Sequence, residues 1–191
     1  MEKYPLRTQL LSCAVLAAIG LAIIQFGQDL PLPQALAVGM PWQDQLGLGA
    51  ALGLAVSLVS AITTLRRPAA EAVQRTTASY SRLDLSGWNP LWISLGAGIS
   101  EEILFRAALQ PLVGIWGASL LFLLAHVRAY EFRRLDGATL LQAGGVFGMA
   151  LMFGFGYEYI GLLAMVVAHT IIDIVGLLLV QRIAEGANRL R

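Results

Sequence analysis

Six side chains that can carry a charge lie inside stretches of sequence that are otherwise apolar. They are two glutamates, one arginine, one aspartate and both histidines of the chain, at Glu101, Glu102, Arg106, Asp173, His126 and His169. At the middle of a membrane span, an Asp, Lys or Arg costs about 2.5–3.5 kcal/mol on insertion scales. Such residues persist where they face the protein interior and have partners or a function, so the group is a candidate site for chemistry.

Helical spacing assigns these side chains to faces. Glu102 and Arg106 are four residues apart and can pair on one helix face. Glu101 points about 100° away from Glu102 and is therefore available to another neighbour. Two further pairs with the four-residue spacing are Phe122 with His126 and His169 with Asp173. We therefore expect three helices to converge on one carboxylate, two imidazoles and one Asp, supported by an ion pair.

The composition indicates which elements position this site. Of the 191 residues, 57% are hydrophobic and 13% are charged, whereas soluble domains have about 45–50% and about 25%. Thirteen Lys and Arg against 12 Asp and Glu give a net charge of +1, which leaves no basic excess for a nucleic-acid partner. The single cysteine, Cys13, excludes a disulfide framework and a cysteine-based zinc cluster. The sequence predicts an all-α, polytopic membrane helix bundle, with residues 1–191 as one membrane domain.

Uncharged apolar runs locate the predicted spans. Four of them, at 8–28, 45–65, 107–127 and 137–157, are each long enough to cross a bilayer. Two further spans, at 89–110 and 159–181, are apolar but interrupted by the charged residues, which gives six transmembrane helices. The first run is longer than the apolar core of a signal peptide, about 7–15 residues, so we expect it to remain as a span.

Glycine and proline refine this picture. Pro111, Gly114 and Gly117 predict a tight turn that shortens the fourth span. Small residues let membrane helices approach closely. We expect such contacts at the glycines of the fifth span, which are Gly144, Gly145, Gly148, Gly154 and Gly156.

Positive charge alternates between the segments that connect the spans. Twelve of the 13 Lys and Arg residues lie in segments 1–7, 66–88, 128–136 and 182–191, and the thirteenth is Arg106. The other connections hold only Asp29, Asp44 and Glu158 as charged residues, and we expect Glu158 to be a solvated residue of an outer loop. The positive-inside rule then places both termini in the cytoplasm and the chain in the cell (inner or plasma) membrane.

The chain divides by function. Residues 1–65 hold two spans without chemical motifs, and residues 66–88 form a cytoplasmic linker, expected in part as an amphipathic helix at the interface. Residues 89–182 form a four-helix catalytic core. Because His126 is two residues from Arg128, at the cytoplasmic end of its span, we expect a water-filled site open toward the cytoplasmic half.

Three short motifs carry a family resemblance. The sequence Glu-Glu-Ile-Leu-Phe-Arg at 101–106 resembles the EExxxR motif of the CPBP (CAAX protease and bacteriocin-processing, or Abi) family. Phe-Leu-Leu-Ala-His at 122–126 and His-Thr-Ile-Ile-Asp at 169–173 are similar to its FxxxH and HxxxN/D motifs. The resemblance covers roughly residues 88–180 and implies an intramembrane endopeptidase of the glutamic type.

The resemblance also implies a role for each residue. Glu101 is the general base and polarises a water together with His126, while His169 and Asp173 stabilise the oxyanion. Supporting positions fall to Glu102, Arg106 and Phe122. The implied substrate is a peptide bond at or near the bilayer, in a membrane-anchored or lipid-modified protein or a precursor peptide.

Asp173 leaves a choice open, because an ionised Asp only accepts hydrogen bonds, whereas an Asn at this position donates. Asp173 is then either protonated or acts indirectly by orienting His169 through its ring nitrogen, and the indirect role is the one we expect.

Two alternatives concern the chemistry and the class of protein. Glu101, His126, His169 and Asp173 are all legitimate zinc ligands, but the chain has no HExxH pattern. We expect no metal and no cofactor, with zinc as the alternative. The non-enzymatic alternatives are a substrate-binding subunit of a small-molecule transporter and an inactive immunity or scaffold protein.

Overall fold

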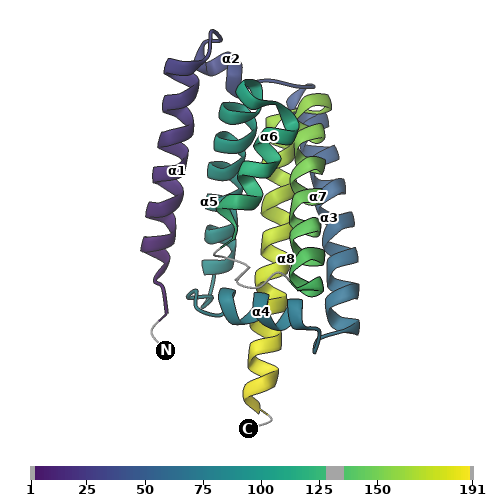
Figure 1. The fold of residues 1–191 in the computed structure, drawn as a ribbon. Coiled ribbons are helices and arrows are strands. Elements are labelled where there is room, and N and C mark those ends of the chain that lie inside the picture. Colours follow the sequence, from purple (N-terminus) through teal and green to yellow (C-terminus); the bar gives the residue numbers. More distant parts are fainter. Residues whose placement is uncertain (1–2, 128–135, 190–191) are drawn as a thin grey trace.

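A computed structural model describes residues 3–127 and 136–189, and within them the chain is helical, with no strand. This confirms the all-α membrane bundle. The elements are α1 (Leu6–Gly27), α2 (Leu32–Leu36), α3 (Trp42–Arg66), α4 (Glu71–Tyr80), α5 (Asn89–Glu102), the π-helix η1 (Ile103–Leu109), α6 (Gln110–Ala125), α7 (Gly137–Tyr159) and α8 (Leu162–Arg189). Both chain ends lie at the same end of the bundle as α4, while α2 lies at the opposite end (Figure 1).

Five helical segments of the described residues are long and apolar enough to cross a membrane, and the longest covers Asn89–Ala125. That segment contains a reversal at Gly114, whose φ of 73° and ψ of 171° are not helical. Past this point α6 lies beside η1 and α7 (Figure 1). The predicted turn is therefore confirmed, and Gly114 adopts the positive φ that glycine tolerates.

The uncharged run over 107–127 is not one helix, as the predicted turn implied. The first part of this run continues the helix that begins at Asn89, as far as Gly114. Only residues 115–125 run back in the opposite direction. At 1.5 Å per residue they reach about 16 Å, roughly half of the bilayer's hydrocarbon thickness. The six-span count and the cytoplasmic placement of both termini remain predictions.

A proline explains the π-helix between α5 and α6. Pro111 has no N–H, so it cannot donate to the carbonyl of Ala107 as a helical residue would. The backbone widens instead, and the N–H of Gln110 donates to the carbonyl of Phe105, five residues back. Gln28 Nε2 donates to the carbonyl oxygens of Ala107 and Ala108, at 2.8 and 2.9 Å. The end of α1 thus supplies the donor that the proline lacks.

The backbones of α3 and α8 approach each other closely. A Cβ added at Gly49 would lie 2.4 Å from the carbonyl oxygen of Ala164, and one at Gly53 would lie 3.0 Å from Ala168 Cα. Only glycine fits such contacts, because the two helix backbones touch there. The hydrophobic core continues from this seam through residues of α7 and η1.

The glycines of α7 behave differently from our expectation. Gly144, Gly145 and Gly148 have nothing within 4 Å of an added Cβ, so the predicted close packing is wrong for them. Gly154 and Gly156 do make close contacts, with side chains of Ile115 and Met165. Glycine content alone could not show which face of α7 has a neighbour.

The predicted interfacial helix exists as α4, which is tied to the start of α7. Arg75 donates to Thr139 Oγ1 at 2.7 Å and forms ion pairs with Asp136, at 3.1 Å, and with Glu71. Asp136 caps α7 by accepting from the Thr139 N–H at 2.8 Å. The hydrogen bonds from Thr139 and Arg75 lower the pKa of Asp136 to about 2. The predicted cytoplasmic charges at 128, 133, 134 and 191 lie outside the described residues.

Candidate active site

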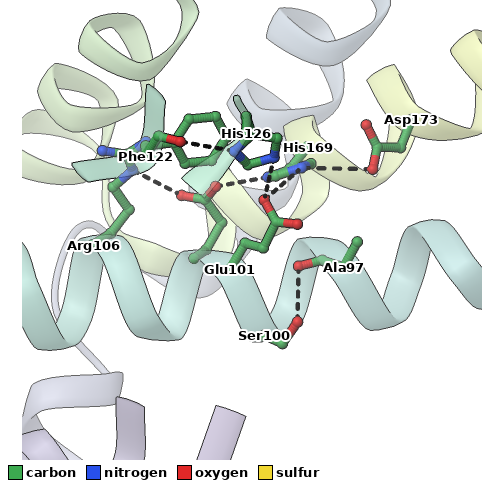
Figure 2. A network of polar contacts seen from close by, with 9 residues as sticks. Ala97, Ser100, Glu101, Arg106, Phe122, His126, His169 and Asp173 are labelled. Carbon is green, nitrogen blue, oxygen red and sulfur yellow. Dashed lines mark hydrogen bonds and ion pairs between the residues drawn. The ribbon is translucent and has the colours of Figure 1, made fainter. Parts of the chain in front are cut away.

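Glu101 lies near the end of α5 and faces both histidine rings (Figure 2). Its Oε2 atom is 3.5 Å from His126 Nε2 and 3.9 Å from His169 Nε2. Neither distance is a direct hydrogen bond, and no described residue donates one to this buried oxygen. One carboxylate oxygen of α5 thus faces imidazoles from α6 and α8, as the spacing predicted.

Glu102 turns to the other side and bridges two charged partners. Its Oε1 is 2.7 Å from His169 Nδ1, and its Oε2 is 3.2 Å from Arg106 Nε. Glu102 and Arg106 are fully buried. An ionised carboxylate only accepts, so Nδ1 of His169 carries a proton and donates it to Glu102. This bond turns Nε2 of His169 toward Glu101 and Asp173.

His126 is oriented by the backbone of its own helix. Its Nδ1 is 2.8 Å from the carbonyl oxygen of Phe122. A carbonyl only accepts, so Nδ1–H is the donor, and Nε2 faces Glu101 as an acceptor while the ring is neutral. The Phe122 ring stacks on His126, with centroids 4.2 Å apart. The four-residue spacing in the FxxxH motif therefore fixes both the tautomer and the plane of the ring.

Phe122 serves a second charged neighbour. The guanidinium carbon of Arg106 lies 5.5 Å from the centre of the Phe122 ring, within the range of a cation–π contact. The Nη1 and Nη2 atoms of Arg106 are buried and donate no hydrogen bond to the described side chains and backbone. The aromatic face is thus the contact that the structure offers this end of the guanidinium.

Asp173 is the most open member of the group. Its Oδ2 is 3.6 Å from His169 Nε2, and its side chain is 36% exposed, against 8% for His169 and 17% for Glu101. The expected role of Asp173 in orienting His169 stays a prediction. The short hydrogen bond that orients the ring comes from Glu102, and the Asp173 contact is longer and reaches the other nitrogen.

The site lies deep in the bundle. Glu101 is twelve residues beyond Asn89, about 18 Å along α5, and His169 is seven residues beyond Leu162, about 10 Å along α8. His126 follows the short α6 and lies 3.5 Å from Glu101, so it is also deep. His126 lies at the C-terminal end of the short α6, and its placement toward the cytoplasm stays a prediction. The side from which the site opens remains a prediction.

Two features of the site were not predicted. The first is the Glu102–His169 hydrogen bond, because sequence spacing showed where Glu102 points but not which helix lies there. The second is Phe153 of α7, whose ring stacks on His169 with centroids 5.3 Å apart and planes 9° from parallel. Phe153 carries no sequence signal, since α7 is rich in apolar residues along its whole length.

Zinc ligation was the alternative chemistry for these side chains. Among the described residues, no group of three or more His, Cys, Asp or Glu side chains is arranged to hold a metal ion. Both Nδ1 atoms are already engaged by Phe122 and Glu102, which leaves the two Nε2 atoms and two carboxylates. Metal-free chemistry stays a prediction, with zinc as the alternative.

The fold and site define a class: a polytopic membrane protein with a buried Glu–His cluster at mid-depth. Residues 84–175 match the family described as type II CAAX prenyl endopeptidase Rce1-like, and this confirms that the segment belongs to the CPBP family. All three motifs lie within it. Members of this family are in general proteases.

A curated relative and the solved structures add little about function. The chain is 36% identical over 86 residues to the uncharacterized protein YpbD of Bacillus subtilis (strain 168), which is 44% of this chain and 42% of that protein. The chain therefore spans less than half the length of this relative. No solved structure matches the chain.

Proposed function

We propose that the chain is an intramembrane endopeptidase of the glutamic type, which hydrolyses a peptide bond in a membrane-associated protein or precursor peptide. The observation that carries the proposal is the position of Glu101 Oε2, buried and facing the Nε2 atoms of both histidines. The match of residues 84–175 to a protease family supports it.

Water activation falls to Glu101 and His126. The water donates one hydrogen bond to the Glu101 carboxylate and one to Nε2 of His126, which accepts because Nδ1–H is held by the Phe122 carbonyl. Glu101 takes a proton as the water oxygen attacks the scissile carbonyl carbon. When the carbon–nitrogen bond breaks, Glu101 returns that proton to the leaving amine.

His169 and Asp173 stabilise the oxyanion. With both ring nitrogens protonated, His169 donates through Nδ1 to Glu102 and through Nε2 to the oxyanion. Asp173, 3.6 Å from Nε2, stabilises the charged ring or, when protonated, donates directly. Fixed donors in a site with little water are worth more than the same donors in solution.

The proposal also covers the membrane location, the cofactor requirement and the supporting residues. The protein resides in the cell (inner or plasma) membrane, and its substrate reaches the site from the cytoplasmic half. The chemistry needs no metal and no other cofactor. Glu102, Arg106 and Phe122 hold the reacting side chains in position and take no part in bond breaking.

The test compares protein termini in cell membranes. Strains with the chain, without it, and with Glu101→Gln are analysed by terminal proteomics for a membrane protein whose end changes length. We expect Glu101→Gln to match the deletion strain, and Glu185→Gln, an exposed isosteric control on α8, to match the wild type.

Two results would contradict the proposal. Cleavage that survives Glu101→Gln would favour a binding role, such as a transporter subunit or scaffold. Cleavage by purified wild-type protein that stops with a zinc chelator and returns with zinc would replace the metal-free mechanism.

A further inference from the structure

A second pocket lies away from the Glu–His cluster, at the end of the bundle opposite both termini. It forms where the chain reverses at Gly114 and meets the last turn of α7. Its volume is about 400 Å³, in the range of small-ligand sites. The lining residues are Val38, Gln110, Pro111, Gly114, Ile115, Tyr157 and Glu158.

The polar side chains that line this pocket are Gln110 and Glu158, which present acceptor oxygens, and Tyr157, whose hydroxyl donates or accepts. Gln110 is 3% exposed, and its Nε2 donates to the carbonyl of Gly154 at 2.9 Å and to Glu158 Oε2 at 3.2 Å. Both partners only accept, so the amide orientation is settled. The remaining Oε1 is buried and receives no hydrogen bond within the described parts of the chain. A buried acceptor without a donor calls for an additional partner.

Glu158 contributes a negative charge to the pocket lining. It is exposed, as we expected for a solvated residue, but it lies in the last turn of α7 rather than in a loop, and it accepts from Gln110. The connections at this end hold Asp29, Asp44 and Glu158 and no Lys or Arg. Arg106 is engaged by Glu102. A ligand with positive charge and N–H donors complements this set.

Exposed aromatic side chains place this end at the membrane surface. Trp42 is 61% exposed and Tyr159 is 72% exposed, and both lie at helix ends beside the pocket end of the bundle. Trp and Tyr are enriched at the level of lipid headgroups. The apolar side chains of Val38, Pro111 and Ile115 suit the carbon atoms next to a charged nitrogen.

We propose that this pocket binds a primary ammonium group, supplied by an aminophospholipid headgroup or by a free amine, with Glu158 and Gln110 as its acceptors.

Native mass spectrometry of the full-length chain in detergent micelles tests the proposal, with phosphatidylethanolamine, phosphatidylcholine and ethanolamine as probes. We expect phosphatidylethanolamine to bind at least about tenfold more tightly than phosphatidylcholine, whose quaternary nitrogen has no N–H donor. Glu158→Gln should weaken this binding about tenfold or more. Asp44→Asn removes an exposed carboxylate at the same end outside the pocket and should leave binding unchanged.

The remaining probe identifies the source of the amine, and a second variant controls for misfolding. Ethanolamine binding without phosphatidylethanolamine binding supports the pocket and assigns it to a free amine. If Glu158→Gln lowers the melting temperature, Val38→Trp, which fills the pocket from another segment, provides the second variant and should also abolish binding. Equal binding of the two lipids, equal loss in Glu158→Gln and Asp44→Asn, or binding of neither amine probe would overturn the proposal.

Discussion

Two neighbouring glutamates separate the site into two sides of different character. The closed side consists of Glu102, Arg106 and the Nδ1 edge of His169, with contacts of 2.7 and 3.2 Å and no exposed carboxylate. The open side consists of Glu101, His126 and Asp173, with distances of 3.5 Å and more and partial exposure. The difference comes from the 100° that separates adjacent residues on a helix.

This contrast indicates which side stabilises the fold and which side carries the chemistry. On the closed side, both carboxylate oxygens of Glu102 are engaged by Arg106 and His169 in a fully buried setting, so this side stabilises the fold. The open side holds a carboxylate oxygen without a hydrogen-bond donor among the described residues, so that oxygen is available to accept from a water. Variants of the open side should therefore lose activity, and variants of the closed side should lose stability.

The largest effect is expected on the open side. His126→Ala removes the acceptor for the attacking water and should lower the cleavage rate about 10²–10⁴-fold, the range for one general acid–base group. Its melting temperature should change little, because the ring is 16% exposed and makes one backbone hydrogen bond. Leu124→Ala, at a 56% exposed position of the same helix, is the control. A large loss of stability would erase the contrast between the two sides.

The second-largest effect, a loss of stability, is expected on the closed side. Arg106→Leu leaves Glu102 buried without its arginine, and breaking a buried pair in this way costs about 3–5 kcal/mol. Denaturation of the purified protein in detergent measures the change. The double variant Glu102→Leu with Arg106→Leu should recover part of the stability. A double variant less stable than Arg106→Leu would mean that the Glu102–His169 bond matters more than the ion pair.

A smaller loss of stability is expected at the end of α1, where Gln28 contacts the helix that carries the closed side. Gln28→Leu removes both hydrogen bonds to the carbonyls of Ala107 and Ala108 and should cost about 1–3 kcal/mol. The same denaturation measurement applies, with Gln25→Leu at an exposed position of α1 as control. Activity per folded molecule should persist, and a selective loss of activity would show that the π-helix geometry reaches the open side.

The smallest effect is expected at Asp173. Asp173→Asn keeps the shape of the side chain, and its amide can donate to the oxyanion, so cleavage should change by less than about tenfold. The pH profile of the rate separates the two roles of Asp173. A profile that stays the same supports direct donation, whereas a loss beyond a hundredfold would show that the carboxylate charge is essential.

Sequence reasoning predicted the parts of this protein that depend on local pattern. Apolar length gave the membrane helices, and four-residue spacing placed Glu102 with Arg106 and Phe122 with His126. It could not predict the partner of His169 Nδ1 or the stacking of Phe153, because both depend on how separate helices pack. Pro111, Gly114 and Gly117 predicted the turn that shortens α6, but they could not show which residue ends one helix and which begins the next.

The contact between α3 and α8 sets the height of a reacting ring. Ala168, which lies against Gly53, directly precedes His169 in α8. Sliding α8 by one turn, about 5.4 Å, would place other side chains against the two glycines of α3 and carry His169 out of line with Glu101. The axial alignment of the site is thus governed by a helix outside residues 84–175. A chimera that exchanges residues 1–65 for an unrelated helix pair would lose that alignment even if all three motifs were intact.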